Sequence, residues 1–180
     1  MSALDNQPTN PNFLSPLGFK FVIKKLPNVN YFCQSVQIPT ISMTVIDQSS
    51  PLLNIPRFGD RITYDQLSLK FRVDENMANY LEIHNWLTGL GHPVSLNQTR
   101  DLSRASDIPK VRTGSALSMV SDGTLIVLSS HKNPTVNIFF RDMFPTAITE
   151  LTFDSTATDI EYLEATASFR YLRYDVEVLT

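Results

Sequence analysis

The chain has 180 residues and a mass of 20.3 kDa, the size of one domain with or without long arms. Its formal net charge of −3 and pI of about 5.5 exclude an overall attraction to nucleic acid or an anionic membrane, and its single cysteine excludes an intramolecular disulfide. Because 42% of the residues are hydrophobic but no apolar run reaches about 18 residues, we expect a packed core, no signal peptide and no membrane partner.

The N-terminal part of the chain divides into a polar arm and a series of short elements. Residues 1–12 are rich in Asn, Pro, Gln and Thr, which predicts a flexible arm before a single domain over residues 13–180. Apolar and lysine side chains then alternate with the period of a half-buried strand. The expected elements are a strand over 19–25, a turn over 26–30, the returning strand of a hairpin over 31–38 and a short strand over 41–46.

The segment 47–64 combines turn-forming residues with several large apolar residues. Serine, proline and glycine interrupt it, which predicts an irregular loop. An irregular segment this apolar needs a cover. Two interpretations remain open: the segment folds back on its own domain, or it covers a neighbouring subunit.

The middle of the chain contains the clearest periodicities. Residues 67–73 alternate as a strand, and Asp74-Glu75-Asn76 is a suitable N-terminal cap for a helix from Met77 to Leu90. Glycines and Pro93 end that helix. Residues 92–123 are then polar and long for a loop, which is typical of functional or mobile segments, and Ser121-Asp122-Gly123 predicts a tight turn.

The C-terminal third returns to strands. We expect them over 124–129, 135–141, 148–154 and 163–179, with a break over 143–146. Together these elements predict a mainly β (α+β) fold, an antiparallel sandwich or barrel-like domain with one flanking helix and long loops.

The sequence contains no recognisable catalytic, cofactor or metal motif. It has no nucleophile elbow, phosphate-binding loop or dinucleotide fingerprint, and its three histidines share no ligand spacing. Cys33 lies in an expected strand, where a small core residue is the simpler interpretation. We therefore expect no enzyme and no cofactor.

Residues 142–180 are acidic, with eight Asp and Glu residues against two arginines. A solvated acidic face explains this composition, as does a surface past which a polyanion slides without binding. Two alternatives belong to other classes of function. A carboxylate-based hydrolase would need two acids of the range Asp142–Glu164 in one cleft. A nucleic-acid-binding β module would use the aromatic run from Phe169 to Tyr174 for base stacking.

The order of segments resembles the tail-tube family of contractile-tailed bacteriophages, including the tube-like proteins of their baseplates. The likeness spans roughly residues 19–178. The matching segments are FVIKKLPNVNYFCQSVQIP (21–39), Gly59-Asp60-Arg61, Tyr64-Asp65-Gln66-Leu67, Asp74-Glu75 before a helix with Trp86, Ile138-Phe139-Phe140, Met143-Phe144-Pro145-Thr146, Leu151-Thr152-Phe153-Asp154 and Phe169-Arg170-Tyr171.

The resemblance implies a virion structural protein. Such proteins form rings of six whose strands line one continuous β-barrel, and stacked rings conduct DNA without catalysis or cofactor. The implied partners are further copies of the chain, adjacent tail-tube or baseplate hub proteins, the sheath and the tape measure, with DNA passing transiently. Assembly would take place in the cytoplasm of the host bacterium. The long segment 92–123 and the N-terminal arm favour a specialised ring near the baseplate as much as a repeating tube subunit.

Two groups of candidate residues follow. Segments 47–64 and 92–123 would act as assembly arms. The expected subunit or ring interface comprises Leu52, Leu53, Ile55, Phe58 and Arg61. The expected lumen-facing acidic residues are Asp154, Asp159 and Glu161, because like charge keeps passing DNA from binding.

Overall fold

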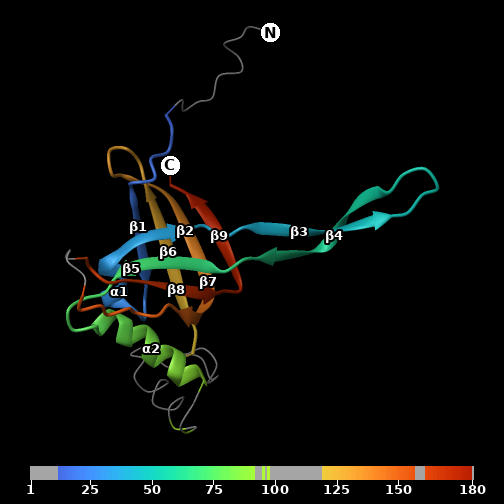
Figure 1. Ribbon diagram of the computed structural model, residues 1–180. Coiled ribbons are helices and arrows are strands. Elements are labelled where there is room, and N and C mark those ends of the chain that lie inside the picture. The colour runs from blue at the N-terminus through green and yellow to red at the C-terminus, as the bar shows by residue number, and fades with distance from the viewer. Residues whose placement is uncertain (1–11, 92–94, 96, 98–118, 157–160, 180) are drawn as a thin grey trace.

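Strands dominate the computed structural model of the chain (Figure 1), which describes residues 12–91, 95, 97, 119–156 and 161–179. This confirms the expected mainly β, antiparallel fold, although these ranges contain two helices rather than one. The elements are β1 (Phe19–Ile23), α1 (Pro27–Phe32), β2 (Cys33–Gln37), β3 (Ile41–Gln48), β4 (Ile55–Tyr64), β5 (Leu67–Arg72), α2 (Ala78–Gly91), β6 (Ser121–Leu128), β7 (Pro134–Ile148), β8 (Glu164–Arg170) and β9 (Arg173–Val178).

Two sheets share the long strand β7. Sheet A has the order β1–β6–β7–β9, and sheet B has the order β7–β8–β5–β2. In Figure 1 the strands of sheet A run vertically, and those of sheet B cross in front of them. All pairs are antiparallel.

The corner between the sheets is made by β7, which belongs to both sheets, and by the consecutive strands β8 and β9. The first part of β7 pairs with β9, and its last part, Phe144–Ile148, pairs with β8. Arg170 lies opposite Phe144 and Arg173 lies opposite Arg141, so β8 and β9 follow one edge of β7 in the same register. The expected strand over 163–179 therefore exists in two pieces, divided at Tyr171-Leu172.

Two expectations about β7 were wrong. No break occurs over 143–146, because β7 continues to Ile148, and residues 149–154 form no strand. Pro145 is accommodated because the ladder with β8 is irregular between Pro145 and Ala147, and irregular or edge positions are where a strand tolerates proline.

The expected turn at 121–123 was also wrong, since these residues open β6.

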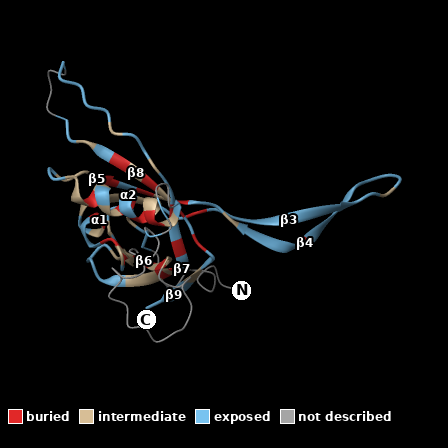
Figure 2. Cartoon of the chain, turned by 90° about the horizontal axis from the view of Figure 1, so that it is seen from below, coloured by how far each residue is buried: buried red, intermediate tan, exposed pale blue. Residues whose placement is uncertain are grey.

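The core lies between the two sheets and is closed at one end by α2. The strand β5 alternates as predicted, with Leu67, Leu69 and Phe71 fully buried. Figure 2 shows buried positions in red on strands of the sandwich, whereas the arm strands β3 and β4 are largely pale blue and thus exposed. Trp86 of α2 packs against Phe169 of β8, and its Nε1–H donates to the carbonyl of Met119 at 2.8 Å.

The helix α2 was predicted to within one residue at each end, and its start is built by a reciprocal pair. The backbone N–H of Asn79 donates to the carboxylate of Asp74, and the N–H of Asp74 donates back to the amide oxygen of Asn79. Asn79 is fully buried and also donates to the carbonyl of Arg72. These bonds satisfy backbone groups that every helix start leaves unpaired.

The predicted hairpin over 19–38 was wrong. Residues 27–32 form α1, which begins at Pro27, and this helix carries the chain from one sheet to the other. As a result β1 pairs with β6 in sheet A, and β2 pairs with β5 in sheet B. Proline suits the first turn of a helix because the N–H that it lacks has no intrahelical partner there.

The irregular loop expected over 47–64 was wrong as well. Residues 41–64 form a long hairpin of β3 and β4 that projects away from the sandwich (Figure 1). We call this hairpin the arm. The predicted strand over 41–46 is confirmed as the first part of β3.

Candidate assembly surfaces

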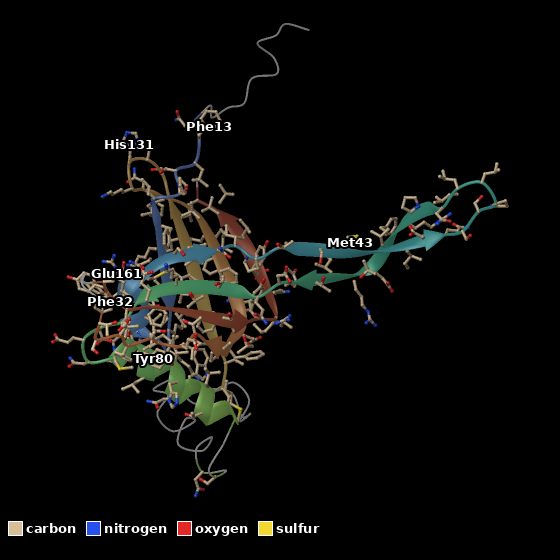
Figure 3. All side chains as sticks on the ribbon, in the orientation of Figure 1. Phe13, Phe32, Met43, Tyr80, His131 and Glu161 are labelled. Atoms are coloured by element: carbon tan, nitrogen blue, oxygen red, sulfur yellow. The ribbon has the colours of Figure 1, made fainter. Side chains whose placement is uncertain are left out.

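The arm carries an apolar face that is not covered by any part of the chain that the structure describes. Cross-strand partners lie on the same side of a hairpin, and the register pairs Met43 with Ile62 and Val45 with Phe58. Each of these four side chains is more than half exposed, and Phe58 is 87% exposed. Figure 3 shows the side chains of the arm, Met43 among them, reaching into solvent. A large exposed apolar face of this kind marks a protein interaction site.

The opposite face of the arm is more polar. Ser42 and Thr63 lie opposite each other there, with their hydroxyl oxygens 2.6 Å apart, and Ile46 is paired with Arg57. The two faces therefore differ in chemistry, so only one of them needs an apolar partner.

A bulge divides the arm in two. The register shifts between Met43 and Val45, where Gly59 of β4 comes close to Thr44 of β3. A Cβ atom at Gly59 would lie 2.5 Å from the carbonyl oxygen of Thr44, so the position requires glycine. Bulges bend a strand and increase its twist, which sets the direction of the outer half of the arm.

All five residues of the expected interface lie on the arm. Leu52 and Leu53 lie in the loop at its tip, where Leu52 is 97% exposed, while Ile55, Phe58 and Arg61 lie on β4. Sequence reasoning missed the apolar residues of β3 in this role, although their alternation was visible in the segment 41–46.

Sheet A offers two further surfaces, its outer strands and its outward face. Neither β1 nor β9 has a second strand partner among the described residues. On the outward face, Arg141 lies within ion-pair distance of Asp122 and Asp175, at 3.9 and 3.5 Å, and Arg173 lies 3.5 Å from Asp175. These four charges largely neutralise one another, and each pair is exposed, so each contributes little to stability.

A groove of about 540 Å³ follows the free edge of β1. It lies between this strand and α1, and its lining includes Phe19, Phe21, Pro27, Tyr31 and Cys33. A second groove of about 480 Å³ lies where the arm joins sheet B, with Gln37, Asp65 and Arg170 in its lining.

The root of the arm is held by an aromatic cluster. Tyr64, at the end of β4, contacts Tyr171 and Tyr174, whose rings also pack on Phe140 of β7. The pKa of Tyr171 is raised to about 12, mainly because the side chain is buried and to a smaller extent because Tyr174 and Tyr64 lie beside it. The buried hydroxyl of Tyr171 has no hydrogen-bond partner among the described residues.

Two of the acidic residues expected in a lumen lie outside the strands of sheet A. Asp154 and Glu161 are exposed and belong to the connection between β7 and β8, and Asp159 lies outside the described residues. Glu161 lies on the side of the molecule away from the arm (Figure 3). Hydrogen bonds from Thr156 lower the pKa of Asp154 below its usual value.

A family model described as phage tail tube protein matches residues 10–177. The chain belongs to this family. The chain therefore has a structural tail-tube role. A search of the curated proteins found no match.

The fold is similar to that of tube components of contractile injection systems. One similar structure is the anti-feeding prophage cap, a tube terminating cap, with 13% identity, 99% of this chain and 100% of that chain covered, and a TM-score of 0.60. A second is the sheath/tube terminator of the extracellular contractile injection system PVC, with 15% identity, 93% and 99% covered, and a TM-score of 0.59. A third is the PVC sheath-tube complex in the extended state, with 15% identity, 99% of each chain covered and a TM-score of 0.55.

The geometry gives no support to the two alternative functions. The lining of one groove includes a single carboxylate, that of Asp65, and the lining of the other includes none, so no acid pair converges there. Phe169 is fully buried and Tyr171 nearly so, which removes them as a stacking surface. Within the described ranges, no group of three or more acidic, histidine or cysteine side chains is placed to hold a metal, and no helix is long and apolar enough to cross a membrane.

Proposed function

We propose that this chain assembles with copies of itself into a ring of six that encloses a DNA channel in a contractile tail. The observation that carries this proposal is the arm, whose apolar face is left exposed by the described residues of the subunit. An assembly that buried Met43, Val45, Phe58 and Ile62 against a neighbour would gain hydrophobic stabilisation that the monomer lacks.

The wall of the channel would be sheet A. Its four strands end on two unpaired edges, and adding copies side by side removes such edges, as closure into a barrel does. The outward face would then line the lumen, where the paired charges of Arg141, Arg173, Asp122 and Asp175 leave little net attraction for DNA.

The acidic residues of the connection between β7 and β8 are the alternative lining. If sheet A forms the wall, neutralising Asp154, Asp159 and Glu161 together leaves both assembly and DNA passage unchanged. If these residues line the lumen, the same triple change slows DNA passage while rings still form.

The partners in this proposal are the layers above and below the ring. The similar structures, which are a tube cap, a tube terminator and a sheath-tube complex, support contacts with tube and sheath proteins. A baseplate hub protein and the tape measure complete the set, and assembly takes place in the cytoplasm of the host bacterium. The arm would hold an adjacent subunit or ring, and the segment 92–123 would serve as a second assembly arm.

The experiment is negative-stain electron microscopy with sedimentation velocity over a concentration series of the purified protein. Rings or tubes with a central hole are expected. Long tubes indicate a repeating tube subunit, and isolated rings indicate a terminal or baseplate layer. A protein that stays monomeric at every concentration, also when mixed with tube fragments, would overturn the proposal.

A further inference from the structure

The two outer edges of sheet A, which have no second strand partner among the described residues, run in opposite directions, and at the end of β1 the side chain of Asn30 accepts from the N–H of Ile23 and donates to its carbonyl. Each neighbouring pair in the order β1–β6–β7–β9 is antiparallel, so with four strands β1 and β9 point opposite ways. A copy related by rotation about a central axis therefore presents its β1 antiparallel to the β9 of its neighbour. No strand has to be reversed to continue the ladder.

The outward side chains on these two edges carry opposite charge. Lys20 of β1 and Glu177 of β9 end the same cross-strand row, which runs Lys20–Ile126–Asn137–Glu177. Both side chains are exposed, and neither takes part in a salt bridge among the described residues. The next outward residue of β9 is Asp175, so a register shifted by two residues still places a carboxylate near Lys20.

The inward side chains on the same edges are apolar. Val176 and Val178 of β9 are 57% and 67% exposed, although they face the side of the core. Their rows across the sheet end on Phe21 and Phe19 of β1. Both phenylalanines belong to the lining of the groove beside β1, but Phe21 is almost fully buried, so Phe19, which is partly buried, and Tyr31, which is 83% exposed, supply most of its apolar surface. The groove thus offers apolar surface to the two valines of a neighbour.

We propose that β9 of one copy docks on β1 of the next, with Glu177 facing Lys20 and with Val176 and Val178 in the groove beside β1. This inference rests on the ring of the proposed function and names the strands and side chains of its seam. The same pairing explains why neighbouring copies join head to tail. Pairing β1 with β1 sets lysine against lysine and pairing β9 with β9 sets acid against acid, and like charges opposite each other destabilise a sheet. Only head-to-tail contacts remain favourable, and these form a ring when the rotation between neighbours closes.

The test uses the full chain and two charge reversals. Lys20→Glu makes both edges acidic, and Glu177→Lys makes both edges basic. Each variant alone is expected to need at least a tenfold higher concentration than the native chain to form rings. An equimolar mixture of the two is expected to assemble near the native concentration, because complementary seams form when the variants alternate. The double variant Lys20→Glu/Glu177→Lys is expected to assemble as well.

The matched controls are Lys132→Glu and Glu75→Lys, which make the same charge changes at exposed positions away from both edges. They are expected to assemble like the native chain, and thermal unfolding of every variant is expected to match it. If the single reversals form rings at the native concentration, or if neither the mixture nor the double variant restores them, the seam is wrong. If the native chain itself forms no ring, the proposed function fails instead.

Discussion

Replacing Phe58 by alanine tests whether the arm acts through its apolar face. Phe58 is 87% exposed in the subunit, so nearly the whole side chain is available to a neighbour. Burying a side chain of this size stabilises a contact by about 2–3 kcal/mol. Losing that amount raises the concentration needed for assembly roughly 30- to 150-fold. Sedimentation velocity over a concentration series of both proteins measures this ratio.

The stability of the isolated subunit should hardly respond. A substitution at an exposed position away from the core changes the free energy of unfolding by about 0.5 kcal/mol or less. For a chain of this size that corresponds to a shift of about 1–2 °C in Tm. Thermal unfolding by circular dichroism separates this outcome from a general loss of structure.

The matched control is Phe153→Ala. Phe153 is 71% exposed but lies in the connection between β7 and β8, away from the arm. It should assemble at the native concentration. Assembly of Phe58→Ala at the native concentration, or an equal defect in both variants, would refute the assignment of the apolar face as the contact surface.

Three further predictions concern the arm, its root and the groove. Gly59→Ala places a Cβ against the carbonyl oxygen of Thr44, so this variant should distort the arm and weaken assembly. The control is Gly91→Ala, because a Cβ there meets no described atom within 4 Å, and it should assemble like the native chain. Equal assembly of the two variants would contradict this prediction. Tyr171→Phe should leave the free energy of unfolding at neutral pH unchanged or slightly higher, because the buried hydroxyl that it removes has no hydrogen-bond partner among the described residues. The pKa of Tyr171 is raised to about 12, so its neutral form stabilises the fold below the unfolded pKa near 10, and that contribution is lost as pH rises to 12; denaturant titrations should show a smaller loss over this range in the variant. Burial raises the pKa of Cys33 from 9.0 to about 11, so the thiolate fraction at pH 8 is about 100-fold below that of an unperturbed thiol, and alkylation at pH 8 should be correspondingly slow; a rate like that of a free thiol would contradict the burial.

The local elements that the sequence predicted well are those in which one face is buried. In β5, Leu67, Leu69 and Phe71 are buried and their neighbours are not, so the period of two was visible. The helix α2 was visible because Asp74 and the glycines mark its ends. In both elements, local propensity and tertiary burial favour the same structure.

The errors fall where burial alternates weakly or where the chain changes sheets. The arm is exposed on both faces, so its hydrophobic pattern lacked the alternation that identifies β4 as a strand. The six-residue α1 is too short to show helical periodicity, which made a turn and hairpin the simpler prediction. Pro145 suggested a break because proline opposes regular pairing, whereas here an irregular ladder at the sheet corner accommodates it.

The candidate surfaces divide in the same way. Apolar residues without an obvious core position, such as Leu52, Leu53 and Phe58, indicated an interface from composition alone. The complementary edges of sheet A did not appear in the sequence, because Lys20 and Glu177 are 157 residues apart and only the ladders through β6 and β7 place them in one row. The fold likewise decides that both side chains are exposed and that neither forms a salt bridge among the described residues.

By itself, the sequence determined the fold class, the helix α2, the absence of recognisable catalytic motifs and the membership of a structural tail-tube family. These properties follow from composition, periodicity and the order of segments, which act over short stretches of chain. Only the tertiary structure decided that residues 41–64 project as an arm, that β7 belongs to both sheets, and that two oppositely charged edges remain free. The physical reason is that strand pairing is set by contacts between distant segments, and no local pattern specifies which edge a strand will join.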